Sequence, residues 1–195
     1  MVDVLVAGSL LVLTAPIQAV VALLVRRRLG SPVLFRQQRP GKDGKVFELV
    51  KFRSMVEPDP SRSLVTDAER LTPFGAWLRS TSLDELPTLW NVLRGEMSLV
   101  GPRPLLVQYL DRYTPDQARR HEVRPGVTGL AQISGRNEVE WNDRLRLDVE
   151  YVDQRSLLLD AEVLWATLML VVRRRGISGA GSLTMTEFGV DDLRK

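Results

Sequence analysis

The longest apolar run of the chain lies near its start, where residues 4–25 contain no charged side chain. A helix of this length reaches across the hydrocarbon of a bilayer. Asp3 is the only charged side chain before the run, and three arginines follow it at positions 26–28. A cleavable signal peptide carries its basic residues before the apolar core. The order seen here therefore predicts a retained membrane anchor, with the arginines on the cytoplasmic side.

Pro16 interrupts this run near its middle. Proline lacks the backbone N–H that would bond to the carbonyl of Val12. In hydrocarbon that carbonyl needs another donor, and Thr14 or Gln18 is near enough to supply one. Two geometries remain open. A kinked helix would span the bilayer, whereas a re-entrant helix would turn at Pro16 and leave both ends on the cytoplasmic face.

A second apolar stretch, residues 157–176, is interrupted by Asp160 and Glu162. Its uncharged part, residues 163–172, is too short to span a bilayer. One interpretation is a helix that lies in the membrane interface, with Trp165 at the level of the headgroups. The other is a core helix that ends in arginines, which suit the negative end of its dipole.

Two runs rich in β-forming residues, 33–39 and 46–55, flank a turn at 40–45 and predict a β-hairpin. Alternation along the second run puts Phe47, Leu49, Lys51 and Arg53 on one face. Lys51 would then lie among apolar neighbours, where a lysine either extends its amine to water or binds a phosphate.

The remaining pattern predicts mostly helices. Residues 57–73 suit a loop with a short helix, and residues 97–100 suit a short strand that follows a stop at Gly95. We expect helices over residues 74–80, 86–96, 105–113, 114–123 and 140–152, and loops over 124–137 and 176–195. The expected fold is mainly α with a small β-hairpin, divided into an anchor at 1–28 and one further domain at 29–195.

Composition narrows the chemistry. The chain has 195 residues, no cysteine and one histidine, His121, so disulfides, thiolate zinc sites and a Ser-His-Asp triad are poor expectations. Carboxylates, lysines and arginines remain, and hard oxygen ligands favour Mg²⁺ if a metal binds. Neither of the usual glycine-rich phosphate loops is present. Nine Lys/Arg lie between positions 26 and 53 against two acids, and a basic cluster beside an apolar anchor is typical of membrane-surface or phosphate contact.

The stretch "SLDELP" holds two adjacent acids, Asp84 and Glu85. Ser82 and Glu85 have the spacing of a capping box. In that case Pro87 would occupy the fifth helical position, where its missing N–H breaks a helical bond. A helix that begins at Asp84, or a distorted first turn, avoids this loss. Asp84 would then lie at a positive helix end, which keeps its carboxylate ionised and attracts phosphate.

Adjacent helical residues project about 100° apart, so Asp84 and Glu85 cannot be equivalent partners. One can serve as a carboxylate nucleophile, and the other as a support or metal contact. A phosphoryl group under attack needs cations, for which Lys51, Arg79 and Arg103 are candidates. The simpler alternative is an ordinary capped helix, followed at "GPRP" by a rigid turn with a solvated arginine.

These residues resemble the bacterial sugar transferases, the monotopic polyprenol-phosphate phosphoglycosyltransferases. The resemblance is carried, in chain order, by "SPVLFRQQRPG", "KFRSM", "LTPFGAWLRSTSLDELPTLWNVLRGEMSLVGPRPLL", "HEVRPGVTGLAQISGRN" and "LDVEYV". The short length and the "GISGAGSLTMTEF" tail look most like the small members, as in the bacillosamine-type pathway.

The resemblance implies transfer of a sugar-1-phosphate from a UDP-sugar, expected to be N-acetylated, to undecaprenyl phosphate, with release of UMP. It implies a ping-pong mechanism with Asp84 as nucleophile and Glu85 beside it, and a required Mg²⁺ held by Asp84. It also implies an anchor that is re-entrant at Pro16, with interfacial helices and a catalytic domain on the cytoplasmic face of the bacterial plasma membrane. By motif match, the residues that bind substrate phosphates or nucleotide are Lys51, Arg79, Arg103, Arg124, Gln132 and Arg136.

Two alternatives stay open. The donor can instead be UDP-galactose or UDP-glucose, for capsule or exopolysaccharide synthesis. The chain can also be a non-catalytic, membrane-anchored basic module, which would leave "LDEL" and "GPRP" unexplained. Membrane lipid is an expected partner and nucleic acid is not, and a homodimer is allowed. One departure from the family pattern is Ala15 before Pro16 in place of the usual serine, so either Thr14 takes over its role or the kink is held differently.

Overall fold

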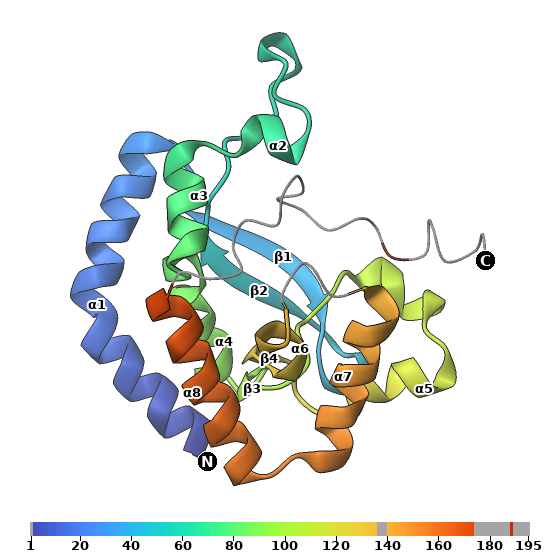
Figure 1. The fold of residues 1–195 in the computed structure, drawn as a ribbon. Helices are drawn as coiled ribbons and strands as arrows, with labels where there is room; N and C mark the ends of the chain where they lie inside the picture. The colour runs from blue at the N-terminus through green and yellow to red at the C-terminus, as the bar shows by residue number, and fades with distance from the viewer. Residues whose placement is uncertain (1, 136–139, 174–187, 189–195) are drawn as a thin grey trace.

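The computed structural model describes residues 2–135, 140–173 and 188, and a long helix along one side of a small mixed domain dominates the view (Figure 1). The helices and strands that form this part of the chain are α1 (Val2–Arg28), β1 (Leu34–Pro40), β2 (Val46–Phe52), α2 (Asp67–Arg70), α3 (Pro73–Ser80), α4 (Leu89–Leu93), β3 (Ser98–Val100), α5 (Pro115–Ala118), β4 (Gly126–Thr128), α6 (Leu130–Ile133), α7 (Trp141–Gln154) and α8 (Leu157–Arg173). Short 3₁₀ segments join them: η1 (Lys42–Gly44), η2 (Pro60–Arg62), η3 (Leu83–Thr88), η4 (Val107–Arg112) and η5 (Arg119–Glu122). The expectation of a mainly helical chain with a β-hairpin is confirmed.

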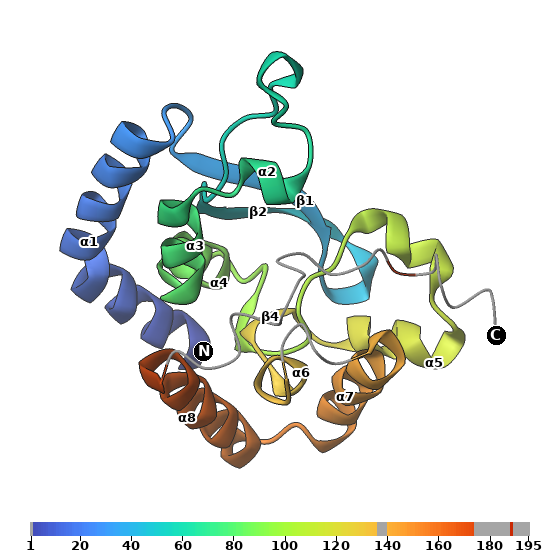
Figure 2. The same cartoon turned by 45° about the horizontal axis from the view of Figure 1, so that its top comes forward.

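Helix α1 contains Pro16 and still runs from Val2 to Arg28. Figures 1 and 2 both show it bent near its middle, with the concave side towards the rest of the protein. Thr14 Oγ1 donates to the carbonyl of Leu10 (2.6 Å), and Gln18 Nε2 donates to Thr14 Oγ1 (3.0 Å). Thr14 and Gln18 therefore do form hydrogen bonds beside Pro16, but the backbone carbonyl that accepts is that of Leu10. The expected acceptor, the carbonyl of Val12, was wrong. A hydroxyl bonded to a carbonyl one turn back favours a bend in the helix.

Both arms of α1 are docked on the domain. Ala7 belongs to a buried cluster with Phe47 of β2 and Val92 of α4, while Val25 packs in a second cluster with Leu78 of α3. Ser98 Oγ also donates to Asp3 Oδ2 near the start of the helix (2.7 Å). The two contacts on one side explain why the bend opens towards the domain.

The outer side of α1 is apolar and exposed. Val12 and Leu13, beside the bend, are 75% and 73% exposed. By length and composition, α1 is the one helix among the described residues that qualifies to cross a membrane. A single bent helix is compatible with both a spanning and a re-entrant anchor, so the re-entrant geometry stays a prediction.

Helix α8 lies close to the N-terminal end of α1 in both views. Val163 faces the core and is fully buried, but Leu157, Trp165 and Val172 are each more than half exposed. Helix α8 thus packs on the core through one side and exposes apolar side chains on the other, and its placement in the membrane interface stays a prediction. The C-terminal expectation over residues 176–195 lies outside the described residues, except for Phe188.

The hairpin pairs β1 with β2 in an antiparallel register, with Phe35 opposite Lys51 and Leu34 opposite Phe52. Phe47, Leu49 and Arg53 are buried, as the alternation predicted. On its other side β2 contacts η3 and α4. There the buried side chain of Asn91 accepts from Val50 N (3.1 Å) and donates to the carbonyl of Glu48 (2.7 Å). These bonds satisfy backbone groups at the free edge of β2 and fix α4 beside it, directly after η3.

A second small sheet was not predicted. Strands β3 and β4 pair in parallel, with Ser98 opposite Gly126 and Val100 opposite Thr128. The short strand expected at 97–100 is confirmed. The loop expected over 124–137 was wrong in part, because β4 and α6 lie within it. Three glycines made this segment look irregular, but Gly126 is required by its neighbour: a β-carbon there would lie 2.1 Å from the backbone nitrogen of Gly101.

The helical segments between residues 105 and 123 are shorter than predicted. The helix expected over 105–113 is the 3₁₀ segment η4, and the one expected over 114–123 is α5 followed by η5. The helices expected at 74–80 and 140–152 match α3 and α7. The helix expected over 86–96 was wrong in part, because its first residues belong to η3 and α4 spans only Leu89–Leu93.

Candidate active site

The acidic pair lies on η3, which starts after a residue with left-handed backbone. Ser82 has φ 54° and makes no side-chain capping bond. Pro87 lies inside η3, where the shorter 3₁₀ repeat accommodates it before α4 begins. A regular helix that starts at Asp84 was therefore wrong. The alternative of a distorted first turn is what the structure shows, and the capping box of Ser82 does not form.

Glu85 accepts hydrogen bonds from two cations. Lys51 Nζ lies 2.6 Å from Glu85 Oε1, and Arg103 Nη2 lies 3.0 Å from the same oxygen. The Lys51 and Glu85 side chains are only 16% and 19% exposed. Burial alone would raise the pKa of Glu85, but the charges of Lys51 and Arg103 outweigh it and lower that pKa to about 2. Glu85 is thus a permanent anion that holds the two cations in place.

Asp84 has a different environment although it is the adjacent residue. It is buried, and within the described chain its carboxylate makes no hydrogen bond. Burial, and then the negative charge of Glu85, raise the pKa of Asp84 to about 6, against the opposing charges of Lys51, Arg79 and Arg103. A carboxylate that is desolvated, close to cations and not engaged by them is suited to attack an electrophile.

Arg79 reaches the site from the last turn of α3. Its Nε donates to Ser54 Oγ (2.9 Å), and burial lowers its pKa while the charge of Asp84 opposes that effect. Gly75 on the same helix makes this approach feasible, because a β-carbon there would lie 1.8 Å from the Ser54 carbonyl oxygen. The structure therefore brings Lys51, Arg79 and Arg103 to the acidic pair, as predicted.

The Gly-rich segment is placed less completely. Arg124 is exposed, and its carbonyl oxygen packs against Gly101. Gln132 lies on α6, and both polar atoms of its amide are buried without a hydrogen-bond partner in the described chain. Arg136 lies outside the described residues. In the described chain neither Arg124 nor Gln132 forms a hydrogen bond or ion pair with Asp84, so the roles of these residues in substrate binding remain predictions.

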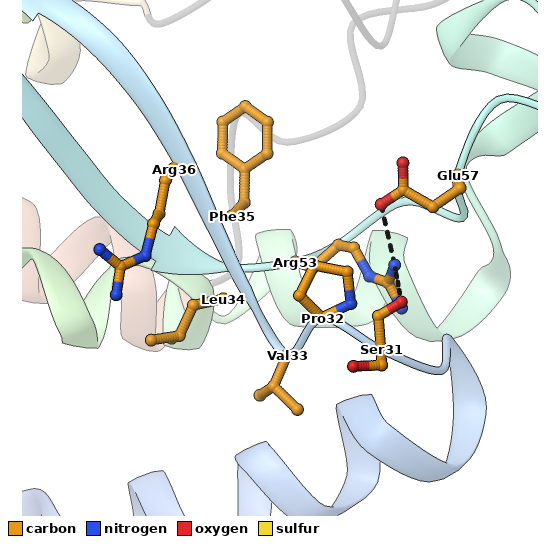
Figure 3. Close-up of a pocket in the computed structure, with 8 residues that line it drawn as sticks. All are labelled: Ser31, Pro32, Val33, Leu34, Phe35, Arg36, Arg53 and Glu57. Carbon is orange, nitrogen blue, oxygen red and sulfur yellow. Dashed lines mark hydrogen bonds and ion pairs between the residues drawn. The ribbon is translucent and has the colours of Figure 1, made fainter.

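The basic cluster between positions 26 and 53 does not form one solvated face. Arg26–Arg28 are exposed at the end of α1, but Arg53 is buried. Its guanidinium donates to the carbonyls of Leu29 and Ser31 and to Glu57. Figure 3 shows Arg53 with Ser31 and Glu57 around a hollow of about 600 Å³, which residues 31–36, after the end of α1, also line. Arg53 thus ties the anchor to the domain, and the acidic pair does not line this hollow.

The single histidine of the chain, His121, contacts the turn of the hairpin. His121 Nδ1 faces the carbonyl of Gly41 (3.2 Å), and burial, followed by the charge of Arg120, lowers its pKa to about 4. With a pKa of about 4, the imidazole of His121 is neutral at neutral pH. No cluster of three or more His, Cys, Asp or Glu side chains occurs among the described residues. Asp84 could contribute one carboxylate to Mg²⁺, a cation that usually takes one or two carboxylates together with substrate phosphates and water.

The groups that position the pair were not predicted from the sequence. Thr88 Oγ1 donates to the carbonyl of Val50 (3.0 Å), and Asn91 completes the attachment to β2. Both side chains are buried. Their signal was available in "LPTLWNVL", where polar residues three positions apart share one helical side with apolar neighbours.

Comparison with known proteins identifies the same family over most of the chain. The family described as "Bacterial sugar transferase" matches residues 1–174. The "Uncharacterized sugar transferase EpsL" of Bacillus subtilis is 49% identical over 187 residues, which cover 95% of this chain and 93% of that protein. The "UDP-galactose-lipid carrier transferase" of Erwinia amylovora is 40% identical over 192 residues, covering 89% of this chain and 40% of that protein.

A third relative is the "UDP-glucose:undecaprenyl-phosphate glucose-1-phosphate transferase" of Klebsiella pneumoniae. It is 40% identical over 177 residues, covering 85% of this chain and 38% of that protein. The chain therefore spans about two fifths of the length of the last two relatives, and nearly all of the first.

Proposed function

The chain belongs to the bacterial sugar transferase family, and on that premise we propose that it transfers a sugar-1-phosphate from a UDP-sugar to undecaprenyl phosphate and releases UMP. The names of two relatives specify galactose and glucose. They support UDP-galactose or UDP-glucose as the donor better than the N-acetylated sugar that was expected first from the sequence.

The observation that carries the proposal is the inequality of the two acids. Lys51 and Arg103 engage Glu85, whereas Asp84 keeps its carboxylate without such partners. In the first step an Asp84 carboxylate oxygen attacks the sugar-linked phosphorus of the UDP-sugar. A bond forms between that oxygen and phosphorus, the bond from phosphorus to the bridging oxygen breaks, and UMP leaves with the electron pair.

In the second step an oxygen of undecaprenyl phosphate attacks the same phosphorus. The bond from phosphorus to Asp84 breaks, which restores the carboxylate and yields the lipid-linked diphosphate sugar. Lys51, Arg79 and Arg103 supply positive charge around the phosphoryl group in both steps, where desolvated cations are most effective. Glu85 holds two of these cations at fixed positions.

We also propose Mg²⁺ as the cofactor, with Asp84 and the diphosphate oxygens of the donor as its ligands. When bound there it would neutralise charge on the departing phosphate. The proposed location is the cytoplasmic face of the bacterial plasma membrane, with α1 as the anchor. The exposed apolar side chains of α1 and α8 support membrane contact, since a soluble protein rarely exposes so many.

The test is to incubate the purified protein with Mg²⁺, undecaprenyl phosphate and one UDP-sugar at a time, and to measure UMP. The panel contains UDP-galactose, UDP-glucose and their N-acetylated forms. UMP release with one of the first two supports the donor proposed here. Release only with an N-acetylated sugar would overturn that choice, and no release with any donor would overturn the enzymatic function.

The nucleophile is tested separately by Asp84→Asn. With Mg²⁺ and the donor but without undecaprenyl phosphate, the wild-type protein should gain the mass of a sugar phosphate in intact mass spectrometry, and the variant should not. Asp43→Asn, an exposed aspartate in the hairpin turn, is the matched control and should form the adduct normally. An adduct on the Asp84 variant would place the nucleophile elsewhere.

A further inference from the structure

The segment Gly101–Pro104 carries Arg103 and has an unusual hydrogen-bonding problem. Prolines at 102 and 104 donate no backbone hydrogen bond, so the segment consists mostly of acceptors. Each of its last three carbonyls accepts from a different part of the chain. Gly126 N donates to Pro102 (2.9 Å), Arg39 Nη1 donates to Pro104 (3.2 Å), and Arg120 Nη2 donates to Arg103 itself (2.7 Å).

Arg120 is fully committed to this position. Its side chain is 1% exposed. Beyond the Arg103 carbonyl, its Nη2 and Nε donate to Asp148 Oδ2 (2.7 and 3.1 Å), and its Nη1 donates to the Tyr113 hydroxyl (3.2 Å). The guanidinium fork therefore joins a carboxylate on α7 to the backbone of the residue whose side chain reaches Glu85.

Asp148 makes the buried cation tolerable. Its side chain is 2% exposed, and a buried charge without a partner strongly destabilises a folded protein. Neither Arg120 nor Asp148 contacts Asp84 or Glu85. Well-packed apolar side chains would often stabilise such a position at least as well as a buried ion pair does. What the ion pair adds is a fixed geometry, which apolar side chains would not specify.

We propose that Arg120, held by Asp148, is a positioning residue for the reaction. It fixes the carbonyl of Arg103, and with Pro104 restricting the same backbone, this fixes the direction in which the Arg103 guanidinium projects. That guanidinium then meets Glu85 and the substrate phosphate. The inference rests on the proposed function and adds to it a support that lies outside the acidic pair and its cations.

The chain offers a matched control in the neighbouring residue. Arg119 also forms an ion pair between η5 and α7, with Asp153. The two side chains of this pair are 37% and 51% exposed. In the described chain Arg119 makes no hydrogen bond to the segment Gly101–Pro104. Arg119→Lys therefore reports the effect of weakening an η5–α7 contact without loss of the Arg103 carbonyl bond.

The experiment is a double-mutant cycle on the rate of phosphosugar-adduct formation, with Arg120→Lys and Arg103→Ala alone and together. Lysine keeps the charge beside Asp148 but cannot reproduce the fork. A misplaced binding group costs about 10–100-fold in rate, which we expect for Arg120→Lys in the wild-type background. In the Arg103→Ala background its further effect should be below about 3-fold, because the group it positions is gone. Arg119→Lys should stay within about 3-fold of wild type.

Equal losses from Arg120→Lys in both backgrounds would overturn the inference, and so would an unchanged rate. If Arg120→Lys does not fold, Asp148→Asn is used in the same cycle, with a loss of about tenfold expected. Failure of both variants to fold would show that the pair is needed only for the structure, which also overturns the inference. Adduct formation and UMP release by the wild-type protein are measured in the same experiment. If the wild-type protein forms neither, the proposed function fails, whatever the variants show.

Discussion

Asp84 should make the folded protein less stable than it would be with a neutral side chain. Burial and the charge of Glu85 raise its pKa from 3.8 to about 6, so the ionised form is penalised in the folded state. At 1.36 kcal/mol for each pKa unit, the penalty is about 3 kcal/mol. Asp84→Asn removes that charge while keeping the shape. The variant should therefore be inactive and more stable, as expected where a site sacrifices stability for reactivity.

The stability penalty of ionised Asp84 should depend on pH in one direction. A carboxyl group with a raised folded pKa binds its proton more tightly in the folded state than in the unfolded state. Its penalty is complete above about pH 6 and is relieved as the pH falls from 6 to 3.8. The advantage of the Asp84 variant should accordingly be largest at pH 7.5 and nearly absent at pH 4.

The assay is thermal unfolding in detergent without Mg²⁺, over pH 4–8. In a chain of this size 1 kcal/mol corresponds to about 2–4 °C, so 3 kcal/mol is an upper bound of about 6–12 °C. Relaxation around the asparagine reduces the gain, and we expect a rise of at least about 3 °C at pH 7.5. Asp43→Asn should show no comparable trend. A melting temperature that falls, or a gain that does not depend on pH, would refute the reasoning.

Three other variants test the packing around the site. Lys51→Met leaves the buried Glu85 carboxylate with one cation fewer, so it should lower the free energy of unfolding by about 3 kcal/mol and also lower the adduct rate. The control Arg36→Met removes an exposed cation and should lower the free energy of unfolding by less than about 1 kcal/mol; equal losses would contradict the burial of the Lys51–Glu85 pair. Asn91→Leu deprives the β2 edge of its partners and should cost about 2–3 kcal/mol; an unchanged unfolding midpoint would show that the edge finds other partners. Gly75→Ala should displace α3, because its β-carbon would lie 1.8 Å from a carbonyl oxygen, and should lower both melting temperature and activity. Gly8→Ala meets its nearest atom at 3.7 Å and is the neutral control, so similar results for the two glycines would contradict the close approach.

Several features of the fold could be predicted from the sequence because they depend on local pattern. Alternation identified the buried face of β2, and Gly95, with φ 75°, ends α4 at the predicted stop. Helix lengths were predicted less well between residues 105 and 123, since 3₁₀ and α segments share similar apolar spacing. Strand β4 was missed because it exists only through pairing with β3, a strand from a distant part of the chain that places Ser98 opposite Gly126.

The candidate site divides in the same way. The sequence by itself determined the residue types: two adjacent acids, three cations in matching motifs, and an apolar anchor interrupted by Pro16. It could not determine that Glu85 would take the cations and Asp84 would not, because that depends on which side of η3 faces Lys51. Tertiary structure decided this through Thr88 of η3 and Asn91 of α4, which hold these two segments against β2. The buried pair of Arg120 and Asp148 behind Arg103 contributes in the same way. Adjacent residues of one chain receive opposite electrostatic environments only when distant segments pack around them, and no local pattern records that packing.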